Sequence, residues 1–258
     1  MSLSLRQTGL IAGRELRSLF TTPLYWVSTG VFFLAASTIF VALLFDFARM
    51  GPMRTAEDLS GNITIEVIEQ LFAVIHFFLL VQIPLLTMRS FAEERRQGTL
   101  SLLTTTPVGE WSIVLGKFIA YLTVLGTYLL ATLAMPLFAS YLSDPEWPVV
   151  ISCYTALVLA ACAYVALGLF YSALTESQVI AAVLTYTTLF GLLILSQLAR
   201  SLPTAELVRL AEHLTLLHHV EGFIEGQIQS ASVAWFLLFS GLCLFLAVRQ
   251  VESLRWRS

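Results

Sequence analysis

The chain has 258 residues, of which 57% are hydrophobic and 12% are charged. A soluble domain is usually about 45–50% apolar and about 25% charged, so this composition indicates a membrane protein and excludes a large soluble catalytic domain. The net charge of −3 gives no global basic field, and nucleic acid is therefore not an expected partner. The three cysteines lie in apolar runs without metal-ligand or redox spacing, which is typical of small buried side chains.

Residues 1–23 predict a helix that lies along the membrane surface. They lack the continuous apolar core of a signal peptide, and a helical projection separates an apolar face from a cationic one. The apolar face carries Leu5, Ala12, Leu16, Leu19 and Phe20, and the cationic face carries Arg6, Arg14 and Arg17. Such a helix directs its cations toward anionic headgroups; the alternative is a solvated helix against a protein partner.

Six apolar stretches follow, and a spanning helix needs about 20 such residues. They cover residues 24–45, 67–88, 113–140, 149–174, 179–199 and 232–248, of which the last is short. Small residues in the fourth and fifth stretches, such as Ala160 and Gly168, suit close helix packing. We therefore expect an all-α polytopic membrane helical bundle that forms one domain over residues 1–258.

The loops predict the orientation of this bundle. If the N-terminus is cytoplasmic, ten of the 14 basic residues lie inside, and only Arg49, Arg54, Arg200 and Arg209 lie outside. This distribution satisfies the positive-inside rule, so both termini are expected in the cytoplasm.

Residues 200–231 form a long connection on the outer side in this topology. Leucines recur there at three- and four-residue spacing, at positions 207, 210, 214 and 217. This periodicity predicts one or two amphipathic outer helices between the fifth and sixth spans.

The connection between the second and third spans concentrates seven charged residues. No helix breaker interrupts residues 90–97, Gly98 stands where a helix C-cap would be, and Thr106-Pro107 offers the start of another helix. Two interpretations remain open on spacing alone. The short charged helix could transmit force from a soluble partner into the spans, or it could be a solvated connector whose charges enforce topology.

Residues 84–118 read PLLTMRSFAEERRQGTLSLLTTTPVGEWSIVLGKF. This segment resembles ABC-2 type transporter permeases, in which a Glu-Arg-rich helix, a Gly-Thr pair, a Leu-rich run and Pro-Val precede Gly-Lys at the start of span three. Three further segments resemble the gliding-motility-type branch of that family: GRELRSLFTTPLYW at 13–26, GLFYSALTESQVIAAVL at 168–184 and HLTLLHHVEGFIEGQI at 213–228.

The resemblance implies a role for each of these segments. Residues 1–23 would be the interfacial elbow helix, residues 89–112 the cytoplasmic coupling region, and residues 200–231 outer helices that close the pathway. Residues 89–98 would form the coupling helix that docks on an ATP-binding subunit, with polar contacts from Glu93, Glu94, Arg95 and Arg96. The full set of coupling positions is Arg89, Phe91, Glu93, Glu94, Arg95, Arg96, Gly98 and Thr99.

The resemblance also implies partners and a location. The chain has no Gly-x-x-x-x-Gly-Lys-Ser/Thr phosphate loop, so we expect ATP hydrolysis in a separate cytoplasmic subunit, present in two copies, and no cofactor here. A second permease chain, identical or homologous, would complete the path for an exported cargo in the bacterial cytoplasmic membrane. The gliding-motility-type branch would add a membrane subunit with a large outer domain.

Polar residues inside the second span are candidates for lining the conduit: His76, Gln82 and Pro84. Polar groups at membrane depth are costly and usually face a bundle interior or a cavity. The alternative is a packing kink satisfied by Ser or Thr on another span. A metal site at His213, His218, His219 and Glu221 is disfavoured, because these side chains do not share a helical face.

Two rival functions come from other classes. A polytopic membrane enzyme would need a convergent intramembrane pair such as Ser with His or two Asp, and the spans contain no Asp. A membrane anchor that recruits an ATPase-driven assembly without moving cargo would use the same coupling helix, so the sequence leaves that alternative open.

Overall fold

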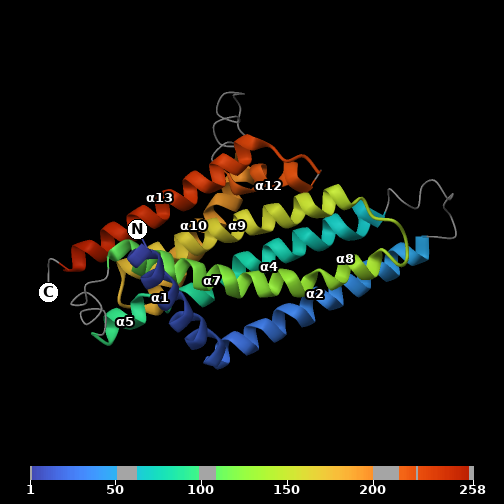
Figure 1. The fold of residues 1–258 in the computed structure, drawn as a ribbon. Coiled ribbons are helices and arrows are strands. Elements are labelled where there is room, and N and C mark those ends of the chain that lie inside the picture. Colours follow the sequence, from blue (N-terminus) through green and yellow to red (C-terminus); the bar gives the residue numbers. More distant parts are fainter. Residues whose placement is uncertain (1, 51–62, 99–108, 200–214, 225, 256–258) are drawn as a thin grey trace.

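A computed structural model describes residues 2–50, 63–98, 109–199, 215–224 and 226–255, which form helices and no strand (Figure 1). In chain order these are α1 (Ser2–Thr21), α2 (Pro23–Met50), the π-helical turn η2 (Thr64–Glu69), α4 (Gln70–Thr87), α5 (Ala92–Arg96), α7 (Glu110–Thr132), α8 (Ala134–Ala139), α9 (Trp147–Leu174), α10 (Gln178–Ala199), α12 (Leu216–Ile224) and α13 (Ser230–Arg255). We call the end of the bundle that carries α1 and α5 the α5 end, and the opposite end the far end.

Six helical stretches are long and apolar enough to cross a membrane, which confirms the predicted all-α bundle. The predicted boundaries are too narrow at two of them. The sixth helix runs from Ser230 to Arg255 and is well over the predicted length. The second helical stretch begins at Thr64, so Glu66 and Glu69 belong to its far end. A prediction that rests on apolar runs alone misses the polar residues at the ends of a long helix, so it places the helix boundaries too close together.

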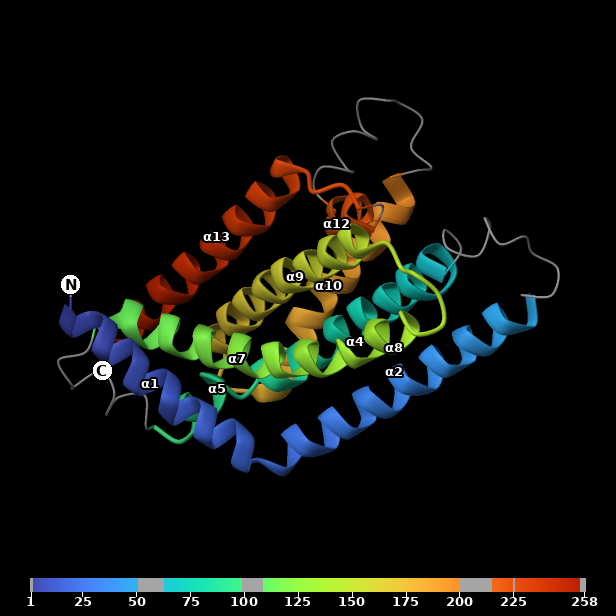
Figure 2. The same ribbon diagram turned by 45° about the vertical axis from the view of Figure 1, so that its right-hand side comes forward.

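Helix α9 forms the centre of the bundle, and α4, α7, α10, α12 and α13 pack around it (Figures 1 and 2). Its small residues allow this close approach, as Ala156, Ala160 and Ala163 are at most 2% exposed. Gly168 lies directly against α4, since a Cβ atom there would stand 2.1 Å from the hydroxyl oxygen of Thr87. The small residues predicted to promote helix packing thus include those at the centre of the bundle.

Helix α1 crosses the start of α7 at the α5 end and then turns into α2 at Thr22-Pro23 (Figure 2). Ala12 is 6% exposed, and Leu16, Leu19 and Phe20 pack on the core, so the apolar face of α1 is turned toward the bundle. Close contact is possible because Gly116 of α7 has no side chain. A Cβ atom there would stand 2.8 Å from Cγ2 of Ile11.

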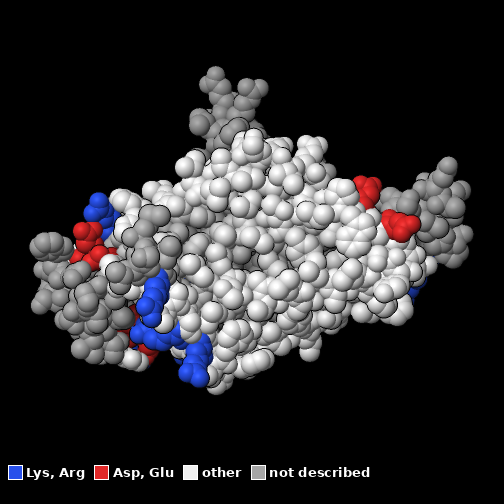
Figure 3. Space-filling view, viewed as in Figure 1, with Lys and Arg blue, Asp and Glu red and all other residues white. Residues whose placement is uncertain are grey.

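The described charges gather at the two ends of the molecule. Figure 3 shows basic and acidic side chains at the α5 end, acidic side chains and a little basic surface at the far end, and an uncharged band between them on this face. Such a band is what a bilayer core requires of the surface it covers.

The outer segment is described only from residue 215 onward, so the leucines predicted at 207, 210 and 214 lie outside the described residues. Helix α12 is amphipathic as expected: Leu216, Val220 and Phe223 are buried against the bundle, while His218 is exposed. The chain then turns at Gly226, whose φ of 78° suits glycine, and enters α13.

Candidate functional site

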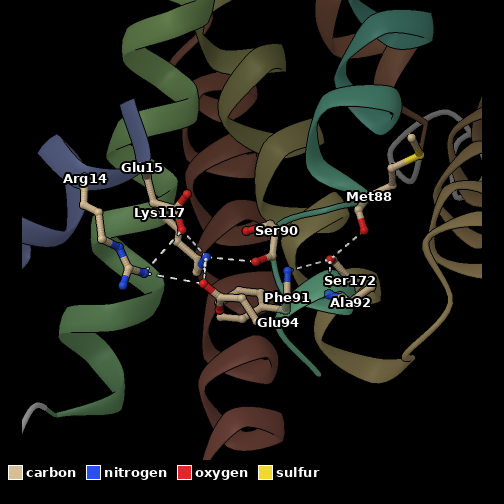
Figure 4. Close-up of polar contacts among 9 residues, drawn as sticks. All are labelled: Arg14, Glu15, Met88, Ser90, Phe91, Ala92, Glu94, Lys117 and Ser172. Carbon is tan, nitrogen blue, oxygen red and sulfur yellow. Dashed lines mark hydrogen bonds and ion pairs between the residues drawn. The ribbon is translucent and has the colours of Figure 1, made fainter. Parts of the chain in front are cut away.

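The coupling region contains a helix of five residues, α5, which is shorter than the predicted helix over 90–97. No side chain of its own caps α5. Instead Ser172 of α9 accepts hydrogen bonds from the backbone N–H groups of Phe91 and Ala92, at 2.9 and 3.1 Å, and donates to the Met88 carbonyl at 3.0 Å (Figure 4). A distant hydroxyl therefore does the work of an N-cap and fixes the start of α5 to α9.

A buried ion-pair network joins α5 to α1 and α7, and Lys117 is its centre (Figure 4). Lys117 of α7 is 1% exposed, and its ammonium group donates to Glu15 of α1, to Glu94 of α5 at 3.0 Å and to the Ser90 carbonyl at 2.8 Å. The Phe91 ring lies 5.0 Å from the same nitrogen. All three donor directions of the ammonium group are thus used, as a buried charge requires.

Arg14 covers the solvent side of this network. Its guanidinium lies 3.4 Å from Glu94 and 3.8 Å from Glu15, and its side chain is 56% exposed. One lysine and one arginine therefore share two carboxylates from different helices. We call Arg14, Glu15, Glu94 and Lys117 the elbow network.

Arg95 attaches the other side of α5 to the end of α9. Its guanidinium donates to the Ala173 carbonyl at 2.8 Å and pairs with Glu176 at 3.3 Å. Arg89, which precedes α5, donates to the side-chain oxygen of Gln178 at the start of α10, at 3.2 Å. Four helices thereby hold the coupling region: α1, α7, α9 and α10.

The predicted coupling positions that the structure describes lie partly toward the bundle and partly away from it. Phe91 is fully buried, and Glu94 and Arg95 are engaged with the bundle as described. Arg96 is 66% exposed and pairs with Glu93 at 3.2 Å, so these two residues form the outward charged surface of α5. Gly98 has a φ of 68°, which confirms the predicted helix stop, whereas Thr99 and the Thr106-Pro107 restart lie outside the described residues.

The polar residues of the second span are buried in the bundle. The ring nitrogen Nε2 of His76 lies 2.7 Å from the hydroxyl oxygen of Tyr164 on α9. Gln82 is 5% exposed, and its side-chain amide has no hydrogen-bond partner within the described part of the chain. Pro84 interrupts the hydrogen bonding of α4, and Tyr186 of α10 donates to the Val81 carbonyl one turn earlier at 2.5 Å.

The histidines near the far end lie in a packing environment. His219 stacks on Trp235 with ring centroids 4.8 Å apart, and its Nδ1 lies 3.1 Å from the hydroxyl oxygen of Ser232. His213 lies outside the described residues. Within the described ranges, no three His, Cys, Asp or Glu side chains converge on a point that could hold a metal ion.

The predicted coupling positions do not include several residues that hold the coupling region, among them Glu15, Lys117 and Ser172. Lys117 stands out as a cation inside an apolar helix, and burial of a lysine requires a carboxylate partner. Nothing in the spacing indicates which carboxylate, because Glu15 lies 102 positions away in the chain. Ser172 gives no local signal at all.

Comparison with known proteins agrees with this architecture. Residues 10–229 match a family model described as ABC-2 family transporter protein. A search of curated proteins gave no match. The matched region extends from α1 through α12 and so includes the elbow network, α5 and α9. The chain belongs to the ABC-2 transporter family and is a membrane permease component of an ABC transporter.

Proposed function

We propose that this permease takes its driving force at α5, from a separate cytoplasmic ATP-binding subunit that docks on the Glu93–Arg96 surface. In this proposal the α5 end lies in the cytoplasm of a bacterium, and two permease chains with two ATP-binding subunits form an exporter. The observation that carries the proposal is the attachment of the coupling region: three contacts hold α5 itself, and Arg89 just before it makes a fourth.

The anchors supply a physical route for force. A push on α5 reaches α9 through Ser172 and Arg95, and it reaches α1 and α7 through Lys117. A charged buried contact resists separation because each partner would lose its compensation in a medium of low dielectric constant. Motion of α5 therefore moves whole helices rather than a loose connector.

The test uses a charge reversal on the outward surface of α5. Arg96→Glu should weaken copurification of the ATP-binding subunit with the tagged full-length chain by about tenfold, because it places like charge at the docking rim. Arg249→Glu is the matched control, since Arg249 lies on α13, is 61% exposed and also pairs with a glutamate three residues away. Equal copurification of the Arg96→Glu variant and the unaltered chain would exclude the docking surface.

Transport and anchoring are separated by the effect of cargo. A complex that transports should hydrolyse ATP faster when liposomes supply the cargo on the α5 side. If the complex still assembles but no candidate cargo changes its rate of ATP hydrolysis, the result would favour a membrane anchor that moves no cargo. The same assay, run with and without a second, homologous permease chain or a subunit with an outer domain, shows which of these the complex needs.

Of the candidate residues for lining the conduit, we propose that Gln82 rather than His76 contacts the cargo. An amide without a partner is costly in a packed bundle, by about 1–3 kcal/mol, and a contact with moving cargo would explain its retention. His76 already has a hydrogen-bond partner, the hydroxyl group of Tyr164. Gln82→Leu should raise the melting temperature in detergent and abolish cargo-stimulated ATP hydrolysis. A stabilised variant with unaltered stimulation would show that Gln82 has only a packing role.

A further inference from the structure

A cavity of about 480 Å³ opens at the α5 end, between the elbow that joins α1 to α2 and the segment that joins α4 to α5. It lies beside the elbow network and receives Glu15 from it. Apolar side chains also line it, among them Leu19, Tyr25 and Leu86. A cavity with both kinds of lining at the end of apolar spans is suited to an amphiphilic ligand.

The charged lining is balanced, with two arginines and two glutamates. Arg96 and Glu93 pair with each other, whereas Arg89 uses only its Nε, which donates to Gln178. Its two terminal nitrogens have no hydrogen-bond or ion-pair partner among the residues that the structure describes. A guanidinium with two parallel donors matches a phosphate group.

A carboxylate oxygen is available on the other side of the elbow. Glu15 meets Lys117 and Arg14 through one oxygen, Oε1. Its second oxygen has no partner in the described ranges of the chain. The ammonium group of a headgroup bound at Arg89 could therefore donate a charge-assisted hydrogen bond to this oxygen, and a headgroup without a cation has no such donor.

An apolar stripe leads away from Arg89 along α4. Leu85, Val81 and Phe77 follow it at four-residue steps, so they share one face of the helix. Phe77 is 51% exposed, and the other two are half-buried. Helices α2 and α10 flank the stripe, as shown by the Phe32–Phe78 ring contact and by the bond from Tyr186 to the Val81 carbonyl.

We propose that this cavity binds one phospholipid with a phosphoethanolamine headgroup. Arg89 holds the phosphate, the second oxygen of Glu15 accepts a hydrogen bond from the ammonium group, and one acyl chain lies on the Leu85–Val81–Phe77 stripe. The balanced lining selects a zwitterion over an anionic lipid, and the stripe selects a lipid over a soluble phosphate ester. The site does not depend on the docking proposal, because lipid binding needs no ATP-binding subunit.

The experiment reconstitutes the full-length chain in nanodiscs with equal amounts of phosphatidylethanolamine and phosphatidylglycerol. After release into mild detergent, native mass spectrometry should detect one phosphatidylethanolamine per chain. Arg89→Gln should lower the retained lipid about tenfold, because the variant loses the charge-assisted contact. Arg249→Gln removes an exposed arginine outside the cavity and should retain the lipid.

A second variant protects the test against misfolding. Ser18 is exposed at the cavity, so Ser18→Trp should obstruct the headgroup while Arg89 and the bundle stay intact. Equal retention of phosphatidylglycerol would overturn the zwitterion assignment. Displacement by soluble glycerophosphoethanolamine would overturn the role of the acyl chain. Full lipid retention by both Arg89→Gln and Ser18→Trp would overturn the site.

Discussion

Lys117 shows how a single residue organises the α5 end. Its ammonium group is removed from water and is compensated by carboxylates from two helices that are far apart in the sequence. Such a group contributes little net stability when it is complete, since desolvation offsets much of the attraction. Removal of one member is different, because a charge then remains without compensation. The elbow network therefore acts mainly by specifying where α1 and α5 sit on α7.

Lys117→Met should destabilise the protein by about 3–5 kcal/mol, because Glu15 and Glu94 would lose the buried cation between them and keep only the exposed Arg14. The triple variant Lys117→Met, Glu15→Gln, Glu94→Gln should recover much of this loss, since no buried charge remains uncompensated. Thermal unfolding in detergent measures both. A triple variant as unstable as the single one would show that Lys117 acts through packing rather than charge.

The His76–Tyr164 contact makes a second prediction for single residues. Tyr164→Phe removes the partner of a buried ring nitrogen and should cost about 1–3 kcal/mol. Tyr141→Phe is the control, since Tyr141 is 89% exposed and no loss is expected there. Unfolding midpoints in the same detergent compare the two. If Tyr164→Phe has the same unfolding midpoint as the unaltered chain, the contact contributes nothing to stability.

At the level of helices, much of the architecture could be predicted from the sequence. Apolar runs identify the six long helices because each must satisfy its backbone internally. Gly98 marks the end of α5 because its left-handed φ is costly for other residues. The arrangement of the coupling site could not be predicted in this way. Its contacts join Glu15 with Lys117, and Phe91 with Ser172, which are 102 and 81 positions apart.

The contact of α1 with α7 makes a prediction for these two helices. Gly116→Ala would place a methyl group 2.8 Å from Cγ2 of Ile11 and 3.0 Å from the Thr8 carbonyl oxygen, so α1 must shift. We expect a loss of about 1–3 kcal/mol and weaker coupling to the ATP-binding subunit. Gly126→Ala lies on the same helix with no atom within 4 Å of the added carbon and should be neutral or slightly stabilising. Equal melting temperatures for the two variants would contradict the close contact.

At the scale of the whole molecule, the described charges are sorted between the two ends. The α5 end carries eight of the nine basic residues whose side chains are described, and the far end carries only Arg49. The eight are Arg6, Arg14, Arg17, Arg89, Arg95, Arg96, Lys117 and Arg249. The positive-inside rule predicts that such an end stays on the cytoplasmic side. The net charge of the chain is therefore small although its basic residues are distributed very unevenly between the two ends.

This polarity predicts which end an impermeant reagent reaches. In a background with the three native cysteines replaced by alanine, Tyr141→Cys at the far end should react with a membrane-impermeant maleimide in intact spheroplasts. Gln97→Cys, exposed beside α5, should react only after lysis, because the bilayer shields the cytoplasmic side. Ala160→Cys, fully buried in α9, controls for unfolding, since it should react only in denaturant. If Gln97→Cys reacts with the maleimide before lysis and Tyr141→Cys does not, the orientation is the opposite of the one predicted. It would also place α5 out of reach of any ATP-driven partner.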